Sequence, residues 1–147
     1  MWALDGTVST SITTITIEGT VSFINAELAK LPKILNHNLL LNIVDGDYST
    51  ESITISSFII NGILTLRALT TTATKYSVKP VKISHVIIEY TIADRINIQR
   101  LEFKRNTGNQ LQIGLFVQSE LNISLCDFFS DNIVLVSSKL WNNCAKQ

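Results

Sequence analysis

The chain has 147 residues, of which 46 % are hydrophobic and 16 % charged, and twelve basic residues balance twelve acidic ones. This length indicates one domain, and a neutral chain without a Lys/Arg cluster has no electrostatic attraction to nucleic acid or anionic membrane. The chain opens without a signal-peptide pattern, and no apolar run reaches the roughly 20 residues that cross a bilayer. We therefore expect neither secretion nor membrane insertion.

The first 38 residues differ in pattern from the rest. Thr13–Thr20 alternates apolar and polar residues, which predicts a strand. Val21–Asn38 ("VSFINAELAKLPKILNHN") predicts an amphipathic helix that Pro32 kinks or divides. Such a helix would cap the exposed end of a stacked structure. We interpret residues 1–38 as a strand and capping helix, with a helix face formed by Ile24, Leu28, Leu31 and Leu35.

The chain then repeats an eight-residue pattern, apolar-x-apolar-x-x-apolar-x-apolar, and we call each copy of it a line. "INIQRLEF" (Ile96–Phe103) and "LNISLCDF" (Leu121–Phe128) are the clearest copies. Apolar residues two apart face one way on a strand, so the two-residue gap predicts a tight bend between two short strands. Two further lines begin at Ile53 and at Val81.

The spacing between lines indicates stacking. Apolar runs that begin at Leu64, Val86, Leu111 and Ile133 are separated by 22, 25 and 22 residues, and repeats of about 20–50 residues are typical of solenoids. We predict an all-β fold, a short right-handed parallel β-helix (solenoid) over residues 39–147, with coils of three short strands. An antiparallel sandwich is the alternative, because "DG" at Asp45 and "NG" at Asn61 are hairpin signals.

The C-terminal stretch "SSKLWNNCAKQ" carries Leu140 and Trp141 without a recognisable cap. We expect this end to pair with another chain or to continue into further coils. The two cysteines, Cys126 and Cys144, have no CxxC spacing, so we interpret them as reduced thiols.

The helix ending in "LPKILNHN", followed by "LLLNIVDGDYSTESITISSFIINGILTL", resembles the pectate-lyase-like right-handed β-helix proteins of phages and prophages of Gram-positive bacteria. The later lines are similar to the coils of that fold, and the resemblance covers about residues 21–128. It implies a virion tail-spike component, often homotrimeric, that assembles with other tail proteins and binds or cuts cell-surface polysaccharide. It implies a location in the virion, or in the bacterial cytoplasm before assembly.

Paired carboxylates are the strongest catalytic candidates, because glycoside hydrolysis needs two acids. Glu102 and Asp127 share the seventh position of their lines and would stack on one outward face. The resemblance implies that outward acids hold Ca²⁺ and that a basic residue, here Arg100, abstracts a proton. The simpler interpretation is two solvated acids offset by Arg100 and Lys104.

Binding of a glycan requires only outward amide and aromatic groups. Asn97 and Asn122 occupy matching positions and are predicted to form a polar ladder that could bind a glycan. The alternative is that this ladder only stabilises the stacking of strands. Tyr90, Tyr76 and Trp141 are candidate aromatic platforms.

The remaining motifs carry little chemistry. "DGDY" (Asp45–Tyr48) begins like a Ca²⁺ loop but lacks the later ligands, so a tight turn is preferred. His37 and His85 are far apart, which speaks against zinc. We expect no resident cofactor, with Ca²⁺ as the open alternative. The sequence favours a structural phage component over a polysaccharide lyase or hydrolase, with a bare stacking module as a third alternative.

Overall fold

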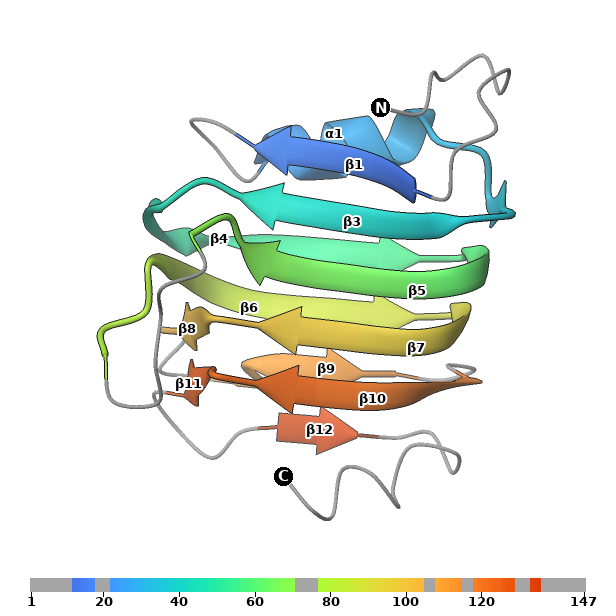
Figure 1. The fold of residues 1–147 in the computed structure, drawn as a ribbon. Helices are drawn as coiled ribbons and strands as arrows, with labels where there is room; N and C mark the ends of the chain where they lie inside the picture. Colours follow the sequence, from blue (N-terminus) through green and yellow to red (C-terminus); the bar gives the residue numbers. More distant parts are fainter. Residues whose placement is uncertain are drawn as a thin grey trace.

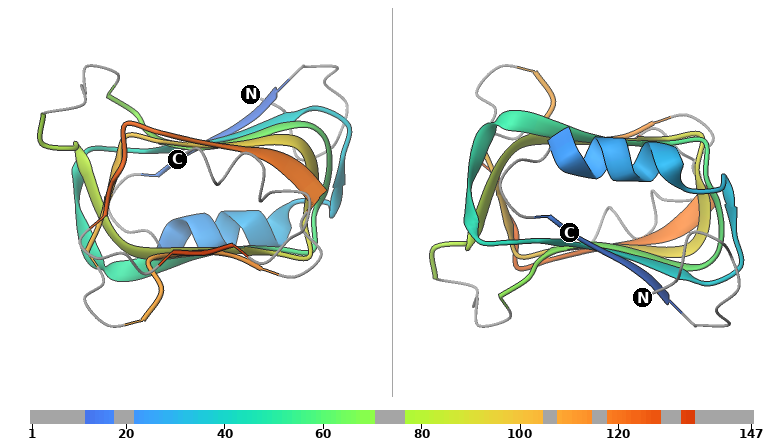
Figure 2. Two further views of the ribbon diagram at one scale, coloured as in Figure 1. Left: turned by 90° about the horizontal axis from the view of Figure 1, so that it is seen from below. Right: turned by 90° about the horizontal axis from the view of Figure 1, so that it is seen from above.

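The computed structural model shows a protein made mainly of parallel β-strands, with one helix among the residues that it describes. The strands form two sheets that lie face to face (Figures 1 and 2). The structure describes residues 12–17, 22–70, 77–104, 108–114, 118–128 and 133–135. The elements are β1 (Ile12–Ile17), α1 (Ser22–Lys30), β2 (Ile34–Leu35), β3 (Asn38–Ile43), β4 (Gly46–Ser56), β5 (Ile59–Ala68), β6 (Val81–Glu89), β7 (Ile92–Gln99), β8 (Leu101–Phe103), β9 (Leu111–Ile113), β10 (Gln118–Ser124), β11 (Asp127–Phe128) and β12 (Ile133–Leu135).

Successive strands alternate between the sheets. Sheet A has the order β1-β3-β5-β7-β10, with β2 beside β5. Sheet B stacks β4 on β6, then β8 and β9 end to end on β6, then β11 and β12. Every pair described is parallel, which confirms the all-β prediction and excludes the antiparallel sandwich for these strands. We call each sheet A strand, with the sheet B strands that follow it, a rung.

The core lies between the sheets, where apolar side chains of successive rungs meet in register. Leu39, Leu64 and Ile96 form one such column, and each is fully buried. On sheet B the rings of Phe103 and Phe128 stack with centroids 4.7 Å apart and planes 1° from parallel. Burial of each such side chain is worth about 1.5–3 kcal/mol, so stacking itself supplies the main stabilisation.

The bend predicted in the repeated lines is a residue with a left-handed backbone. Arg100 (φ 59°) and Leu125 (φ 54°) turn the chain from sheet A to sheet B at equivalent positions of neighbouring rungs. The Arg100 amide donates to the Ser124 carbonyl oxygen at 3.1 Å, so the ladder continues through the corner. Ser57 and Tyr90 have the same backbone but turn the chain from sheet B to sheet A. The prediction of two short strands around a bend is therefore confirmed for three of the four lines.

The line that begins at Val81 does not bend. It forms one strand, β6, and its irregular spacing is absorbed within the sheet, where β4 shifts register between Tyr48 and Ser52. Of the apolar runs spaced by 22, 25 and 22 residues, those at Val86, Leu111 and Ile133 pair in register on sheet B, whereas the run at Leu64 lies in sheet A. Coils of three strands occur only in the last two rungs, since the earlier ones use two long strands.

Gly62 lies inside β5, although Asn61–Gly62 had suggested a hairpin turn. The pairing of β5 with β7 shifts register between Ile60 and Ile63, so this pair forms an irregularity in the strand. A Cβ on Gly62 would lie 2.5 Å from Oδ1 of Asn38. That oxygen accepts a hydrogen bond from the Ile63 amide at 2.8 Å. Glycine is therefore required by a close approach of neighbouring rungs, and not by a hairpin.

The helix is shorter than predicted. It ends at Lys30, because proline at position 32 disfavours a helical residue before it and supplies no amide hydrogen. The chain beyond it forms β2, which pairs with β5. Leu28, Leu31 and Leu35 are buried in the core as the predicted face required, and the side chain of Ile24 lies outside the described residues.

Helix α1 lies against β4, at the edge of sheet B that faces away from β6 (Figures 1 and 2). The Asn25 side chain donates from Nδ2 to the Ser52 carbonyl oxygen at 3.1 Å and accepts at Oδ1 from the Thr54 amide at 3.3 Å. A peptide group of a parallel neighbour would make the same pair of bonds on either side of Ile53. The Asn25 side-chain amide thus supplies, at this edge of β4, the two hydrogen bonds that a neighbouring strand would otherwise make.

Replacing Asn25 with Ala removes both bonds and leaves the β4 edge to water. We expect the free energy of unfolding to fall by about 1–2 kcal/mol, since a net hydrogen bond is worth about 0.5–1.5 kcal/mol. Urea unfolding followed by circular dichroism measures it. Lys30→Ala, which removes the exposed pair with Glu27, is the control and should change stability by less than about 0.5 kcal/mol. Equal effects of both variants would contradict the role of Asn25.

Candidate functional site

The outer face of sheet B carries a column of charged residues. Pairing places Asp47 beside Lys82, Lys82 beside Glu102, and Glu102 beside Asp127. The predicted stacking of Glu102 on Asp127 is therefore confirmed, with a strand spacing of about 4.8 Å. Lys82 and Asp47 were missed because the line of Lys82 starts on sheet B, whereas the lines of the two acids start on sheet A, and Asp47 lies in none of the repeated lines.

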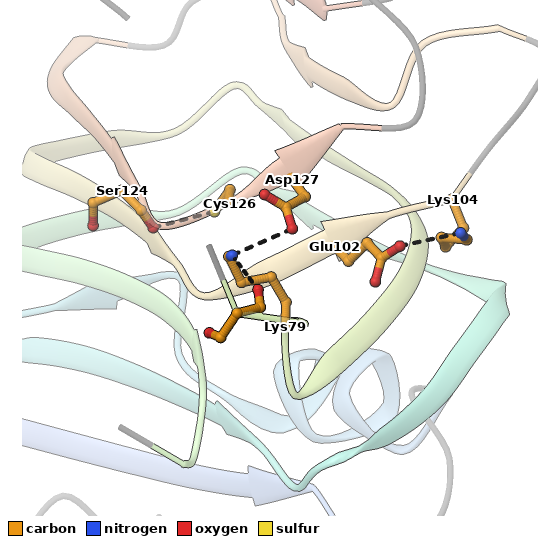
Figure 3. Close-up of polar contacts among 7 residues, drawn as sticks. Lys79, Glu102, Lys104, Ser124, Cys126 and Asp127 are labelled. Atoms are coloured by element: carbon orange, nitrogen blue, oxygen red, sulfur yellow. Dashed lines mark hydrogen bonds and ion pairs between the residues drawn. The ribbon is translucent and has the colours of Figure 1, made fainter. Parts of the chain in front are cut away.

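Each of the two stacked acids has its own lysine (Figure 3). Lys104 Nζ lies 3.1 Å from Glu102 Oε1, and Lys79 Nζ lies 3.2 Å from Asp127 Oδ2. The Lys79 side chain is only 1 % exposed, whereas that of Asp127 is 48 % exposed. Lys79 also donates to the Ser77 carbonyl oxygen at 2.7 Å. The acids are thus neutralised separately.

Arg100 does not join these acids. Its side chain is buried, and Nη2 donates to the Ala68 carbonyl oxygen at 2.9 Å. Of the two basic residues expected to offset the acids, Lys104 contacts Glu102, and Arg100 is directed elsewhere. A proton-abstracting base beside Glu102 and Asp127 would have to be a lysine in this geometry.

The outer face of sheet A carries a column of uncharged polar residues, together with apolar and charged ones such as Ile59, Arg95 and Glu120. Asn97 and Asn122 are in register on β7 and β10, as predicted, and Thr65 continues the column on β5. Asn97 Nδ2 donates to Thr65 Oγ1 at 3.5 Å, while Asn97 Oδ1 is buried without a hydrogen-bond partner among the described residues. A second column follows the strand ends, formed by Asn42, Arg67, Gln99 and Ser124.

Tyr90 lies at the corner before β7 and is 48 % exposed. Asn97 lies five residues beyond the start of that strand, roughly 16 Å along it, so Tyr90 does not share one small site with the asparagines. It lies instead near a column of exposed isoleucines, Ile34, Ile59 and Ile92, that the sequence did not reveal. Tyr76 and Trp141 lie outside the described residues.

The turn residues have structural partners. Asp45 Oδ2 accepts from Thr70 Oγ1 at 2.6 Å. Asp47 Oδ1 accepts from the Ser49 amide at 3.0 Å, and the hydrogen bonds from Ser49, with lesser help from Lys82, lower the pKa of Asp47. His85 shares a hydrogen bond of 3.0 Å with Ser84. Among the described residues, no three His, Cys, Asp or Glu side chains gather as a metal site would require.

Cys126 faces the core at the last described corner. Its thiol donates toward the carbonyl oxygens of Ser124 (3.4 Å) and Ile98 (3.5 Å), and burial raises its pKa to about 11. A thiol of this kind is un-ionised at neutral pH and therefore a poor nucleophile. Cys144 lies outside the described residues.

Comparisons with known proteins add no assignment: no family model, no curated protein and no solved structure matches this chain. Within the described part of the chain, no helix is both long and apolar enough to span a bilayer.

The two stacked acids differ in how much folding depends on them. Asp127→Asn leaves the charge of the buried Lys79 without its carboxylate, so we expect a loss of about 1–3 kcal/mol in unfolding free energy. Glu102→Gln affects a partly exposed pair and should lose less than about 1 kcal/mol. Urea denaturation of both variants measures this. A larger loss for Glu102→Gln would contradict the asymmetry.

Proposed function

We propose that this chain is a right-handed parallel β-helix and serves as a structural component of a phage or prophage tail or host-adhesion apparatus. In this role it contacts bacterial surface polysaccharide, and the outer face of sheet A provides the contact. The proposed location is the virion, after assembly with other tail proteins.

Topology supports the solenoid part of the proposal. Strands alternate between two sheets, and each pairs in parallel with its counterpart in the next rung. Parallel crossover connections are right-handed in about 98 % of cases, which favours that hand here. The helix on the β4 edge fits the place where such a stack needs a cap.

The observation that carries the binding part is the in-register Asn97–Asn122 pair on sheet A. Amides spaced by one strand offer donors and acceptors to hydroxyl groups of a sugar chain. The unpartnered Oδ1 of Asn97 is a free acceptor among the described residues, although a ligand must shift its surroundings to reach it.

A lyase or hydrolase is the second candidate, because Glu102 and Asp127 stack in register. The lysine beside each acid favours the structural role, since each carboxylate is paired separately within the chain. Release of unsaturated or reducing sugar ends, lost in a Glu102→Gln/Asp127→Asn variant that still folds, would favour the enzyme.

The glycan contact is testable with purified cell walls of Gram-positive bacteria. When binding is measured by co-sedimentation, Asn97→Ala with Asn122→Ala should lower the apparent affinity about thirtyfold, because each of the two lost amide contacts is worth about 1 kcal/mol. The matched control is Asn109→Ala with Gln112→Ala, an amide pair beside sheet B. Equal losses in both double variants, or no binding by the parent chain, would contradict the proposal.

The trimer expected from the resemblance would use the column of exposed isoleucines, since three stacked apolar side chains at one corner suit self-association. Light scattering should give three chains per particle, and Ile59→Lys, at the centre of the column, should give monomers. Val78→Lys, at an exposed apolar residue elsewhere, is the control and should leave the trimer intact. A monomeric parent chain would exclude this assembly.

A further inference from the structure

Two arginines lie together where sheet A meets the corner to sheet B. Arg67 is near the end of β5, and its in-register neighbour on β7 is Gln99, the residue before Arg100. The guanidinium of Arg100 donates from Nη2 to the carbonyl oxygen of Ala68, the residue after Arg67. The two positive side chains therefore approach the same stretch of backbone from adjacent rungs.

Neither arginine forms an ion pair with a described residue. Arg67 Nε donates to Oδ1 of the buried Asn42 at 2.9 Å, and no other hydrogen bond of Arg67 is seen among the described residues. Arg100 is 8 % exposed, and its Nε is buried with no hydrogen-bond partner among the described residues. The two arginines thus retain unused N–H donors, and they lie close enough for the charge of Arg67 to act on Arg100.

This arrangement is electrostatically unfavourable without an anion. Burial lowers the pKa of Arg100, and the charge of Arg67 lowers it further. No carboxylate offsets that effect among the described residues, whereas Arg95, on the same sheet, lies 3.3 Å from Glu120. An unsatisfied buried donor costs about 1–3 kcal/mol, so its retention indicates a partner that is not part of the described chain.

We propose that Arg67 and Arg100 form an anion-binding subsite that takes a carboxylate or phosphate group, with Asn42 as the positioning residue for Arg67. The planar guanidinium fork matches both groups with two parallel hydrogen bonds. The inference rests on the proposed function in one respect: the anionic group is taken to be a substituent of the surface polysaccharide that we propose contacts sheet A.

Isothermal titration of the full chain tests the subsite with two probes, inorganic phosphate and trigalacturonate. Arg67→Gln should weaken both about tenfold, as loss of a charge-assisted bidentate contact predicts. Arg95→Gln removes an equal charge from the same sheet and should change binding less than about twofold. Arg67 is chosen because it is only half-buried, so the variant should fold. Arg100→Lys keeps the buried charge, loses the fork, and should weaken binding as well.

The outcomes separate the two proposals. Absence of phosphate and trigalacturonate binding by the parent chain, or equal losses in Arg67→Gln and Arg95→Gln, overturns the subsite. Methyl-esterified trigalacturonate, which is neutral, reports the contact through Asn97 and Asn122 and should not respond to Arg67→Gln. If the neutral sugar binds and the anions do not, the subsite alone fails. If phosphate binds through Arg67 and neither sugar does, the subsite stands and the glycan assignment fails. The tighter of the two anionic probes identifies the group recognised.

Discussion

Parallel, in-register stacking governs this molecule, because each residue meets its counterpart one strand spacing, about 4.8 Å, away. Inside, the rule is satisfied by repetition: Leu39, Leu64 and Ile96 repeat one apolar shape, and Phe103 stacks on Phe128. Outside, repetition of a charge would be repulsive. The outer face of sheet B avoids this by alternating sign at Asp47, Lys82 and Glu102 and by supplying a separate lysine to each stacked acid.

The same rule explains how far the sequence could predict the structure. Spacing within a line identified the corners at Arg100 and Leu125, where a bend lets both halves of the line face inward. The line at Val81 has the same spacing but stays one strand, so spacing alone does not distinguish a corner from a register shift. Spacing between runs identified the pairing of Val86, Leu111 and Ile133 on sheet B, but not that Leu64 lies in the other sheet.

The candidate sites divide in the same way. Stacking of Glu102 on Asp127 and of Asn97 on Asn122 was predictable, because each pair occupies equal positions in two lines that both start on sheet A. The neighbours that determine their chemistry were not. Lys79 comes from an earlier rung and lies outside any repeated line, yet it neutralises Asp127. Arg100, which the sequence suggested as a base for the acids, belongs to the other face because its left-handed corner directs the side chain toward Ala68.

The two outer faces consequently have opposite characters. On sheet B, charges are satisfied within the chain, so a ligand there would have to break Lys79–Asp127 or Lys104–Glu102 before gaining any contact. On sheet A, Asn97 Oδ1 and Arg100 Nε have no hydrogen-bond partner among the described residues, and Arg67 forms no ion pair with a described carboxylate. A ligand that reaches these groups therefore gains hydrogen bonds without breaking an ion pair, although the surroundings of the two buried atoms must shift first. We propose recognition on sheet A because its polar groups are less fully paired within the chain than those on sheet B, and not because of where the acids lie.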